Sequence, residues 1–185
     1  MFKDISNFNN TNNYLPILNG VLITELITLI LGLSINKSSP NLKYLIIWYK
    51  KFGLSAVIVD ISLVIIVIIL TRYFYLKFFN CFNIINFLLL AVAIQVTHDI
   101  SFYYFFRNVP YGKNSIGDFF KDCFDENGKG LSIWESVGNL ILCDSGIVIS
   151  SILFSSLFAN QNLNTNVIML VIIVYLLPYF YTNTS

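Results

Sequence analysis

The sequence has little charge: only 11% of its 185 residues are Asp, Glu, Lys or Arg, whereas 56% are hydrophobic. A soluble domain usually carries about 25% charged residues, and half that share leaves too little polar surface to cover a water-soluble body. The formal net charge of +1 provides no extended basic patch for a nucleic-acid backbone. The composition therefore disfavours a soluble enzyme, a disordered tail and a nucleic-acid-binding protein, and it favours an integral membrane protein.

Cysteines and catalytic motifs are also scarce. Cys81, Cys123 and Cys143 are widely separated, which is the spacing of neither a disulfide framework nor a zinc site. The chain contains no HExxH, no GxSxG and no glycine-rich phosphate-binding loop. We therefore expect no cofactor and no resident metal, and the sequence indicates no particular enzyme chemistry.

Long hydrophobic runs are what the sequence has instead. A helix needs about 20 mostly apolar residues to cross a bilayer. In lipid each such run must satisfy its own backbone hydrogen bonds, so it must be helical even where Ile and Val are frequent. We predict an all-α integral membrane fold, a bundle of about five transmembrane helices that forms a single membrane domain over residues 1–185. The predicted spans are 14–35, 54–75, 83–106, 134–158 and 166–181.

Lysine and arginine are distributed unevenly among the loops, which bears on orientation because cytoplasmic loops are enriched in both. The first and third loops, which share a side, carry Lys37, Lys43, Lys50, Lys51, Arg107, Lys113, Lys121 and Lys129. The other side carries Lys3, Arg72 and Lys77. We therefore expect the N-terminus outside and the C-terminus inside.

The third loop carries a helical pattern of its own over residues 115–126. Apolar residues recur there at the spacing of one helix face, Ser115 with Asp118 fits a capping box, and Asn127-Gly128 fits a stop. Two interpretations are open: an amphipathic helix in the membrane interface, or a helix packed on the ends of the spans. Ahead of it, Pro110 and Gly112 break the chain after the third span. The charged face includes Lys121 and Asp122.

The end of the first loop has the composition of a membrane interface. Tyr44, Trp48 and Tyr49 are expected to form part of an aromatic belt, with Lys50 and Lys51 beside them. On this interpretation the aromatic rings lie at the level of the lipid headgroups.

Ionisable residues inside the spans are costly, so each is a candidate functional residue. At a rise of about 1.5 Å per residue, acids and an imidazole on three predicted spans fall at similar depth in the inner half. Gln95, His98 and Asp99 share one helix face, which we expect to turn inward toward two acids on neighbouring spans. Glu25 lies mid-span without an evident partner, and we expect it to pack on the bundle. The predicted intramembrane cluster comprises Asp60, Gln95, His98, Asp99, Asp144 and Ser145.

Three interpretations of this cluster are open. Buried polar side chains can hydrogen-bond across helices and fix their packing. Carboxylates and a histidine in one layer can instead relay protons or coordinate a cation. Catalysis or metal binding is a weaker alternative, because no spacing in the cluster is diagnostic.

Several stretches, taken together, resemble a family of small uncharacterised multi-span membrane proteins of large DNA viruses that infect algae and protists. The resemblance covers residues 48–181 and includes the His98-Asp99 pair and the Pro-x-Gly loop. Tyr111 stands in that loop where the family pattern suggests a basic residue. The stretches are residues 48–57 (WYKKFGLSAV), 95–106 (QVTHDISFYYFF), 109–114, 119–122, 143–145, 164–166 and 175–179.

The resemblance implies a viral membrane protein with no assigned activity. The leading expectation is a structural or assembly protein in the virion's internal membrane or in a host membrane. Its expected partners are the lipid bilayer, capsid or other viral membrane proteins, and further copies of itself, but no nucleic acid. The alternative is a small ion or proton channel or transporter that uses the Asp/His cluster, and a membrane enzyme is weaker still.

Overall fold

Five long helices make up most of the protein in a computed structural model, which describes residues 2–34, 47–106, 109–110, 112, 115–119 and 133–183. The prediction of an all-α membrane bundle is confirmed, because each of the five helices has a stretch long and apolar enough to cross a membrane. A 3₁₀ turn, η1 (Thr11–Asn13), precedes the first helix. The helices are α1 (Tyr14–Ser34), α3 (Leu54–Phe78), α4 (Ile84–Phe106), α6 (Ile133–Phe158) and α7 (Leu163–Asn183).

The helix boundaries follow the predicted spans closely. The second helix runs three residues beyond its predicted end, to Phe78, and the fifth begins three residues earlier than predicted, at Leu163. Asn83 caps α4 through its side-chain oxygen, which accepts from the backbone N–H of Ile85 at 2.9 Å. Asn162 does the same for α7, accepting from the N–H of Thr165 at 2.8 Å.

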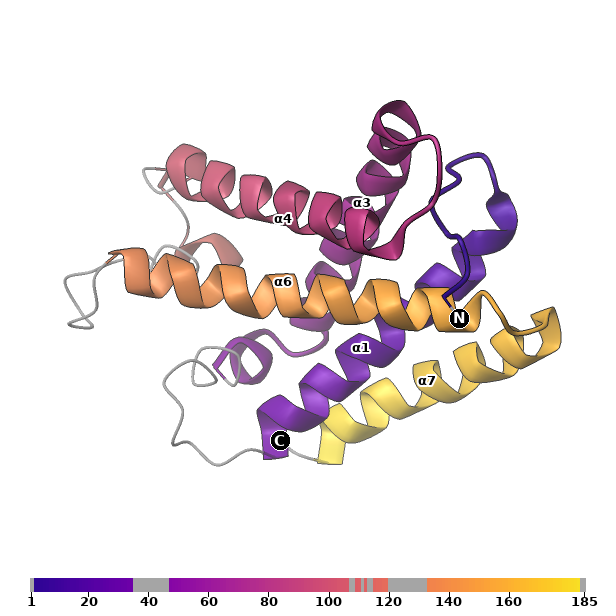
Figure 1. Cartoon of the computed structure of the whole chain (residues 1–185). Helices are drawn as coiled ribbons and strands as arrows, with labels where there is room; N and C mark the ends of the chain where they lie inside the picture. The colour runs from indigo at the N-terminus through magenta and orange to yellow at the C-terminus, as the bar shows by residue number, and fades with distance from the viewer. Residues whose placement is uncertain are drawn as a thin grey trace.

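The five helices reverse direction in turn along the chain, so the two ends of the described chain lie at opposite ends of the bundle (Figure 1). α4 and α6 run side by side, α3 crosses at a steep angle, and α1 lies between α6 and α7. Large apolar side chains stay exposed along the outer faces of the helices, as lipid-facing positions require. The chain is therefore an integral, multi-pass membrane protein.

Small residues meet where α1 crosses α6. A Cβ added at Gly20 would collide with the Ser155 side chain and lie 2.7 Å from the backbone oxygen of Ser151. The Ser155 hydroxyl donates to the Ser151 carbonyl within α6 at 2.6 Å and lies 3.4 Å from the carbonyl of Ile17 across the same interface. Membrane helices that lack a hydrophobic driving force for association use small residues in this way, because close backbone approach increases packing.

The N-terminal segment folds back onto the end of the bundle through Arg72. This arginine is fully buried, and its Nη2 donates to the carbonyl of Asn7 and, at 2.9 Å, to that of Asn10. Its guanidinium also lies 4.7 Å from the centre of the Tyr14 ring. The charge of Arg72 was counted with the second loop, but the residue lies within α3, as the predicted span 54–75 places it, and it binds the segment before α1.

The third loop is described only in part. A helical turn covers residues 116–119, and the Ser115 hydroxyl accepts from the N–H of Asp118 at 3.1 Å, as the capping-box pattern predicts. Pro110 and Gly112 are exposed, whereas the rest of the predicted helix, including Lys121 and Asp122, lies outside the described residues. The start of this helix packs on protein, because Phe119 is buried against the rings of other residues.

Candidate functional site in the bundle interior

A short helical segment, residues 47–52, inserts two aromatic side chains into the bundle. It ends at Gly53, whose φ of 57° and ψ of −133° suit a glycine because they disfavour a side chain. The chain can therefore turn sharply from this segment into α3. The prediction of lipid-level belt aromatics is wrong for Trp48 and Tyr49, which are 5% and 0% exposed.

Both aromatic side chains end on an interior carboxyl. The Tyr49 hydroxyl donates to Oε1 of Glu25 on α1 at 2.8 Å, and the Trp48 Nε1–H donates to Oδ2 of Asp60 on α3 at 2.9 Å. The Trp48 ring also stacks on Phe119, with centroids 5.3 Å apart. Segment 47–52 is therefore bound to two transmembrane helices by polar contacts and to the third loop by aromatic packing.

Tyr49 is held as a hydrogen-bond donor by its surroundings. Burial raises the pKa of its phenol, and the neighbouring carboxyls of Glu25 and Asp60 raise it further, because each disfavours the charged phenolate. The hydroxyl thus keeps its proton. Sequence reasoning missed this partner of Glu25, since Tyr49 is 24 residues away and on a segment expected at the surface.

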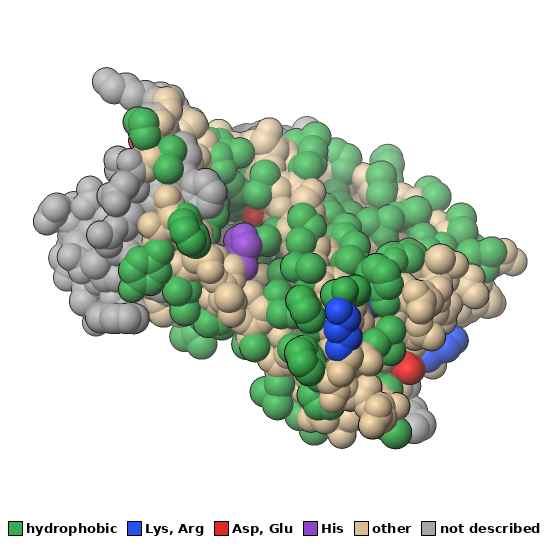
Figure 2. Space-filling view, turned by 90° about the horizontal axis from the view of Figure 1, so that it is seen from above, with side chains coloured by type: hydrophobic (Ala, Val, Ile, Leu, Met, Phe, Trp, Pro, Cys, Tyr) green, Lys and Arg blue, Asp and Glu red, His purple; other side chains and the backbone are tan. Residues whose placement is uncertain are grey.

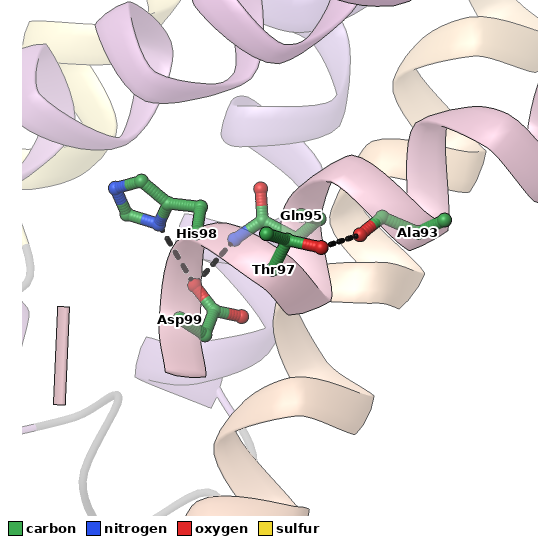
Figure 3. Close-up of polar contacts among 5 residues, drawn as sticks. All are labelled: Ala93, Gln95, Thr97, His98 and Asp99. Atoms are coloured by element: carbon green, nitrogen blue, oxygen red, sulfur yellow. Dashed lines mark hydrogen bonds and ion pairs between the residues drawn. The ribbon is translucent and has the colours of Figure 1, made fainter. Parts of the chain in front are cut away.

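On α4, Gln95 and Asp99 are buried side by side (Figure 3). Gln95 Nε2 donates to Asp99 Oδ1 at 2.8 Å, and His98 Nδ1 lies 3.0 Å from the same oxygen. Asp99 Oδ2 and Gln95 Oε1 are buried and have no hydrogen-bond partner. Oδ1 of Asp99 therefore takes part in both contacts, whereas Oδ2 takes part in none.

His98 does not share the buried position of its neighbours. Its side chain is 41% exposed, against 5% for Asp99, and it stacks on Phe102 with ring centroids 6.0 Å apart. The prediction that the whole face of Gln95, His98 and Asp99 turns inward thus holds for the first and last only. Figure 2 shows His98, in purple, beside a recess in a largely hydrophobic surface, with an acidic side chain visible in the recess.

Asp144 and Ser145 approach this group from α6. The Asp144 carboxyl interacts electrostatically with Asp99 and with Asp60, so the structure brings acids from α3, α4 and α6 near one another. Glu25 of α1 in turn interacts with Asp60. The Ser145 hydroxyl is buried without a hydrogen-bond partner.

The interior thus contains four carboxyls from four helices, Glu25, Asp60, Asp99 and Asp144. In the described part of the chain no lysine or arginine pairs with any of them, and the one ion-pair distance is that from His98 to Asp99. No three His, Cys, Asp or Glu side chains among the described residues are arranged to hold a metal ion.

No protein-family model matches the chain, and neither a curated protein nor a solved structure matches it.

Proposed function

We propose that the protein is a structural or assembly protein of a large DNA virus, in the virion's internal membrane or in a host membrane that supplies it. The main support for a structural role is that buried polar side chains form hydrogen bonds between different helices and segments. In addition to the Glu25 and Asp60 contacts, Asn19 on α1 donates to Asn166 on α7, with the two side chains 3.0 Å apart. Ser156 on α6 donates to the backbone of Lys3 at 2.6 Å.

These contacts support a scaffold because they hold the bundle in one arrangement. A hydrogen bond between membrane helices contributes only about 0.6 kcal/mol on average, but several of them across different helix pairs specify which faces meet. The viral origin is supported by the resemblance of residues 48–181 to the viral family. We also propose that capsid or other viral membrane proteins contact the charged third loop, and that copies of the chain associate.

The proposed orientation, with the N-terminus outside and the C-terminus inside, is supported by the distribution of lysine and arginine. Arg72 lies at the same end of the bundle as the N-terminal segment that it binds. Together with Lys3 and Lys77 it makes three cations on that side, against eight in the first and third loops, and the positive-inside rule places the richer side inside.

Mass spectrometry of purified virus particles tests the assembly role. We expect the protein in intact particles, resistant to external protease and released when detergent dissolves the internal membrane. Detection in infected-cell membranes without detection in the particles would contradict a virion role. An abundant contaminating host membrane protein, followed in the same gradient, provides the control for carry-over.

A second candidate function, a small proton or ion transporter, is favoured by one specific observation. The carboxyls of Asp99 and Asp144 interact electrostatically, and Asp99 Oδ2, Gln95 Oε1 and Ser145 Oγ lack hydrogen-bond partners. An unpaired buried polar atom costs about 1–3 kcal/mol. Asn19, Arg72 and Ser151 also have such atoms, so the presence of acids, and not the missing partners alone, favours this candidate. Intramembrane acids facing the bundle interior often mark ion or proton pathways.

Flux through the reconstituted protein tests this second candidate. Liposomes that contain the protein and a pH-sensitive dye are subjected to a pH step, with and without a membrane potential. Faster dye response than in empty liposomes, lost in Asp99→Asn and Asp144→Asn but kept in Asp118→Asn, is the expected result. Equal responses in protein-containing and empty liposomes would exclude transport of protons.

A further inference from the structure

Segment 47–52 has two faces of different character. Trp48 and Tyr49 are buried and contact acids of the bundle, whereas Lys50 and Lys51 are exposed. Among the described residues, no carboxylate lies within ion-pair distance of either lysine. The exposed face of the segment therefore presents two adjacent positive charges without a partner of opposite charge.

The depth of these lysines follows from the neighbouring spans. The apolar stretch of α3 begins at Leu54, three residues after Lys51. Asp60 lies six residues after Leu54, and Glu25 lies six residues before Leu31, where the apolar stretch of α1 ends. At about 1.5 Å per residue, both acids lie about 9 Å inside the span ends, and the aromatic side chains that reach them account for most of that distance. The segment therefore lies near the membrane surface, where a flexible lysine can extend its amine among the headgroups.

Aromatic packing holds this basic face in place. Trp48 and Phe52 of the segment pack with Phe119 of the third loop, and the centroids of the three rings lie 5.0, 5.3 and 5.5 Å apart. Lys51 Nζ lies 5.3 Å from the Phe52 centroid and 5.9 Å from that of Phe119, within the range of a cation–π contact. Such contacts orient the ammonium group but leave its charge. A ligand that binds there therefore has less side-chain entropy to overcome.

Exposed apolar side chains adjoin the two lysines. Ile47, three residues before Lys50, is exposed, and Leu54 and Ile58 at the beginning of α3 are both more than half exposed. Leu54 and Ile58 are four residues apart and share a helix face, which leads from the lysines into the membrane. A basic group at the surface followed by apolar side chains at greater depth matches the order of a phospholipid, whose headgroup lies above its acyl chains.

We propose that Lys50 and Lys51 bind the headgroup of an anionic phospholipid, whose acyl chain lies along Leu54 and Ile58. The class of lipid follows from charge: two ammonium groups without a carboxylate partner attract a headgroup of net negative charge, whereas a zwitterionic headgroup brings its own cation. Basic residues at a membrane surface gain affinity for anionic lipids in this way. The proposed orientation places this loop on the cytoplasmic side, where anionic lipids are concentrated. The lipid site goes beyond the assembly role and depends on neither virion incorporation nor transport.

Lys77, near the other end of α3, provides a comparison within the same helix. It is also exposed, but its Nζ donates to the Tyr73 hydroxyl at 2.7 Å and lies 4.2 Å from the centre of the Tyr73 ring. Its neighbours in sequence, Leu76 and Phe78, add no second positive charge. We therefore expect no preference for anionic lipids at Lys77, which makes it the matched control for the two lysines of segment 47–52.

Native mass spectrometry of the full chain in detergent tests the site. Dioleoylphosphatidylserine and dioleoylphosphatidylcholine have the same acyl chains but differ in headgroup charge, and we expect the native protein to bind the phosphatidylserine more tightly. Lys50→Gln and Lys51→Gln should each weaken phosphatidylserine binding about fivefold, and the double variant about 25-fold, with phosphatidylcholine binding unchanged. Lys77→Gln should bind both lipids as the native protein does. No preference for phosphatidylserine in the native protein, or an equal loss in Lys77→Gln, would overturn the proposal.

Two further measurements separate the parts of the proposal. The double variant Lys50→Arg and Lys51→Arg keeps both charges and should keep the preference for phosphatidylserine, whereas its loss in a variant that circular dichroism shows to be folded would overturn the role of charge. Glycerophosphoserine, the same headgroup without acyl chains, should bind far more weakly than the lipid. Equal binding of the two would overturn the placement of an acyl chain along Leu54 and Ile58. Detection in virus particles without a preference for anionic lipid would reject this site and keep the assembly role.

Discussion

The Tyr49 hydroxyl donates a 2.8 Å hydrogen bond to Oε1 of Glu25, and this contact joins the segment before α3 to the middle of α1. Both side chains are buried, at 0% and 2% exposure. The contact explains how an acid can lie in the centre of a membrane helix: a tyrosine from a neighbouring segment provides the donor that lipid cannot. It also makes segment 47–52 part of the bundle.

Tyr49→Phe should destabilise the protein, because it removes this donor and leaves Glu25 buried without its partner. We expect a loss of about 1–3 kcal/mol in the free energy of unfolding, measured by thermal or denaturant unfolding in detergent. Tyr175→Phe is the matched control, since Tyr175 is 69% exposed on α7. Equal stability of the Tyr49 variant and the native protein would show that the Tyr49–Glu25 contact is not a structural tie.

Arg72→Gln should release the N-terminal segment from the bundle. The change removes the charged donor to the carbonyls of Asn7 and Asn10, and hydrogen bonds to charged groups contribute about 1.5–3 kcal/mol. Amide hydrogen exchange of residues 2–13 should accelerate, while exchange in α6 and α7 stays the same. Lys77→Gln, which changes an exposed cation on the same helix, should leave residues 2–13 protected. Full protection in the Arg72 variant would show that Arg72 does not hold this segment.

Gly20→Ala should weaken the crossing of α1 and α6. The added methyl group would collide with both the side chain and the backbone of Ser155, and overpacking of this kind typically costs about 1–3 kcal/mol. Gly146→Ala is the control: it has open space around it in α6, so alanine should raise stability by about 0.5–1 kcal/mol there. The same change in stability for both variants would mean that α1 and α6 do not approach as described.

Labelling of native cysteines should reveal the orientation. Cys81 is free and exposed between α3 and α4, at the same end of the bundle as the N-terminus. In a variant that retains this cysteine alone, a membrane-impermeant maleimide should react from outside intact cells. A variant that retains only Cys123, in the third loop, should react only after permeabilisation. The reverse pattern would invert the proposed topology.

The fold was predictable from the sequence because spans in lipid depend on length and hydropathy alone. Every predicted span contains a helix, and the errors at the ends are a few residues, as at Phe78 of α3. Arg72 lies inside the predicted span 54–75, but its contact could not be foreseen: its Nη2 donates to backbone carbonyls of the N-terminal segment, while its Nε and Nη1 have no partner. Such long-range contacts leave no local trace in the sequence.

The candidate site was only partly predictable. Helical spacing correctly places Gln95 and Asp99 together, but it cannot say how far around the helix the buried face extends, and His98 falls beyond its edge. Trp48 and Tyr49 have the composition of a membrane interface. Their burial depends on the turn at Gly53 and on hydrogen bonds to acids in α1 and α3. The periodicity of the sequence does not predict contacts between such distant segments.

The central claim is that most interior polar groups join helices, whereas the acids Asp99 on α4 and Asp144 on α6 do not. The free energy of unfolding of Asp144→Asn tests this claim most directly. The substitution breaks no hydrogen bond with a described residue and removes a carboxyl that lies near Asp99 and Asp60. The account predicts a free energy of unfolding equal to or higher than that of the native protein. A loss of about 1–3 kcal/mol, the size expected when a buried tie is broken, would contradict it.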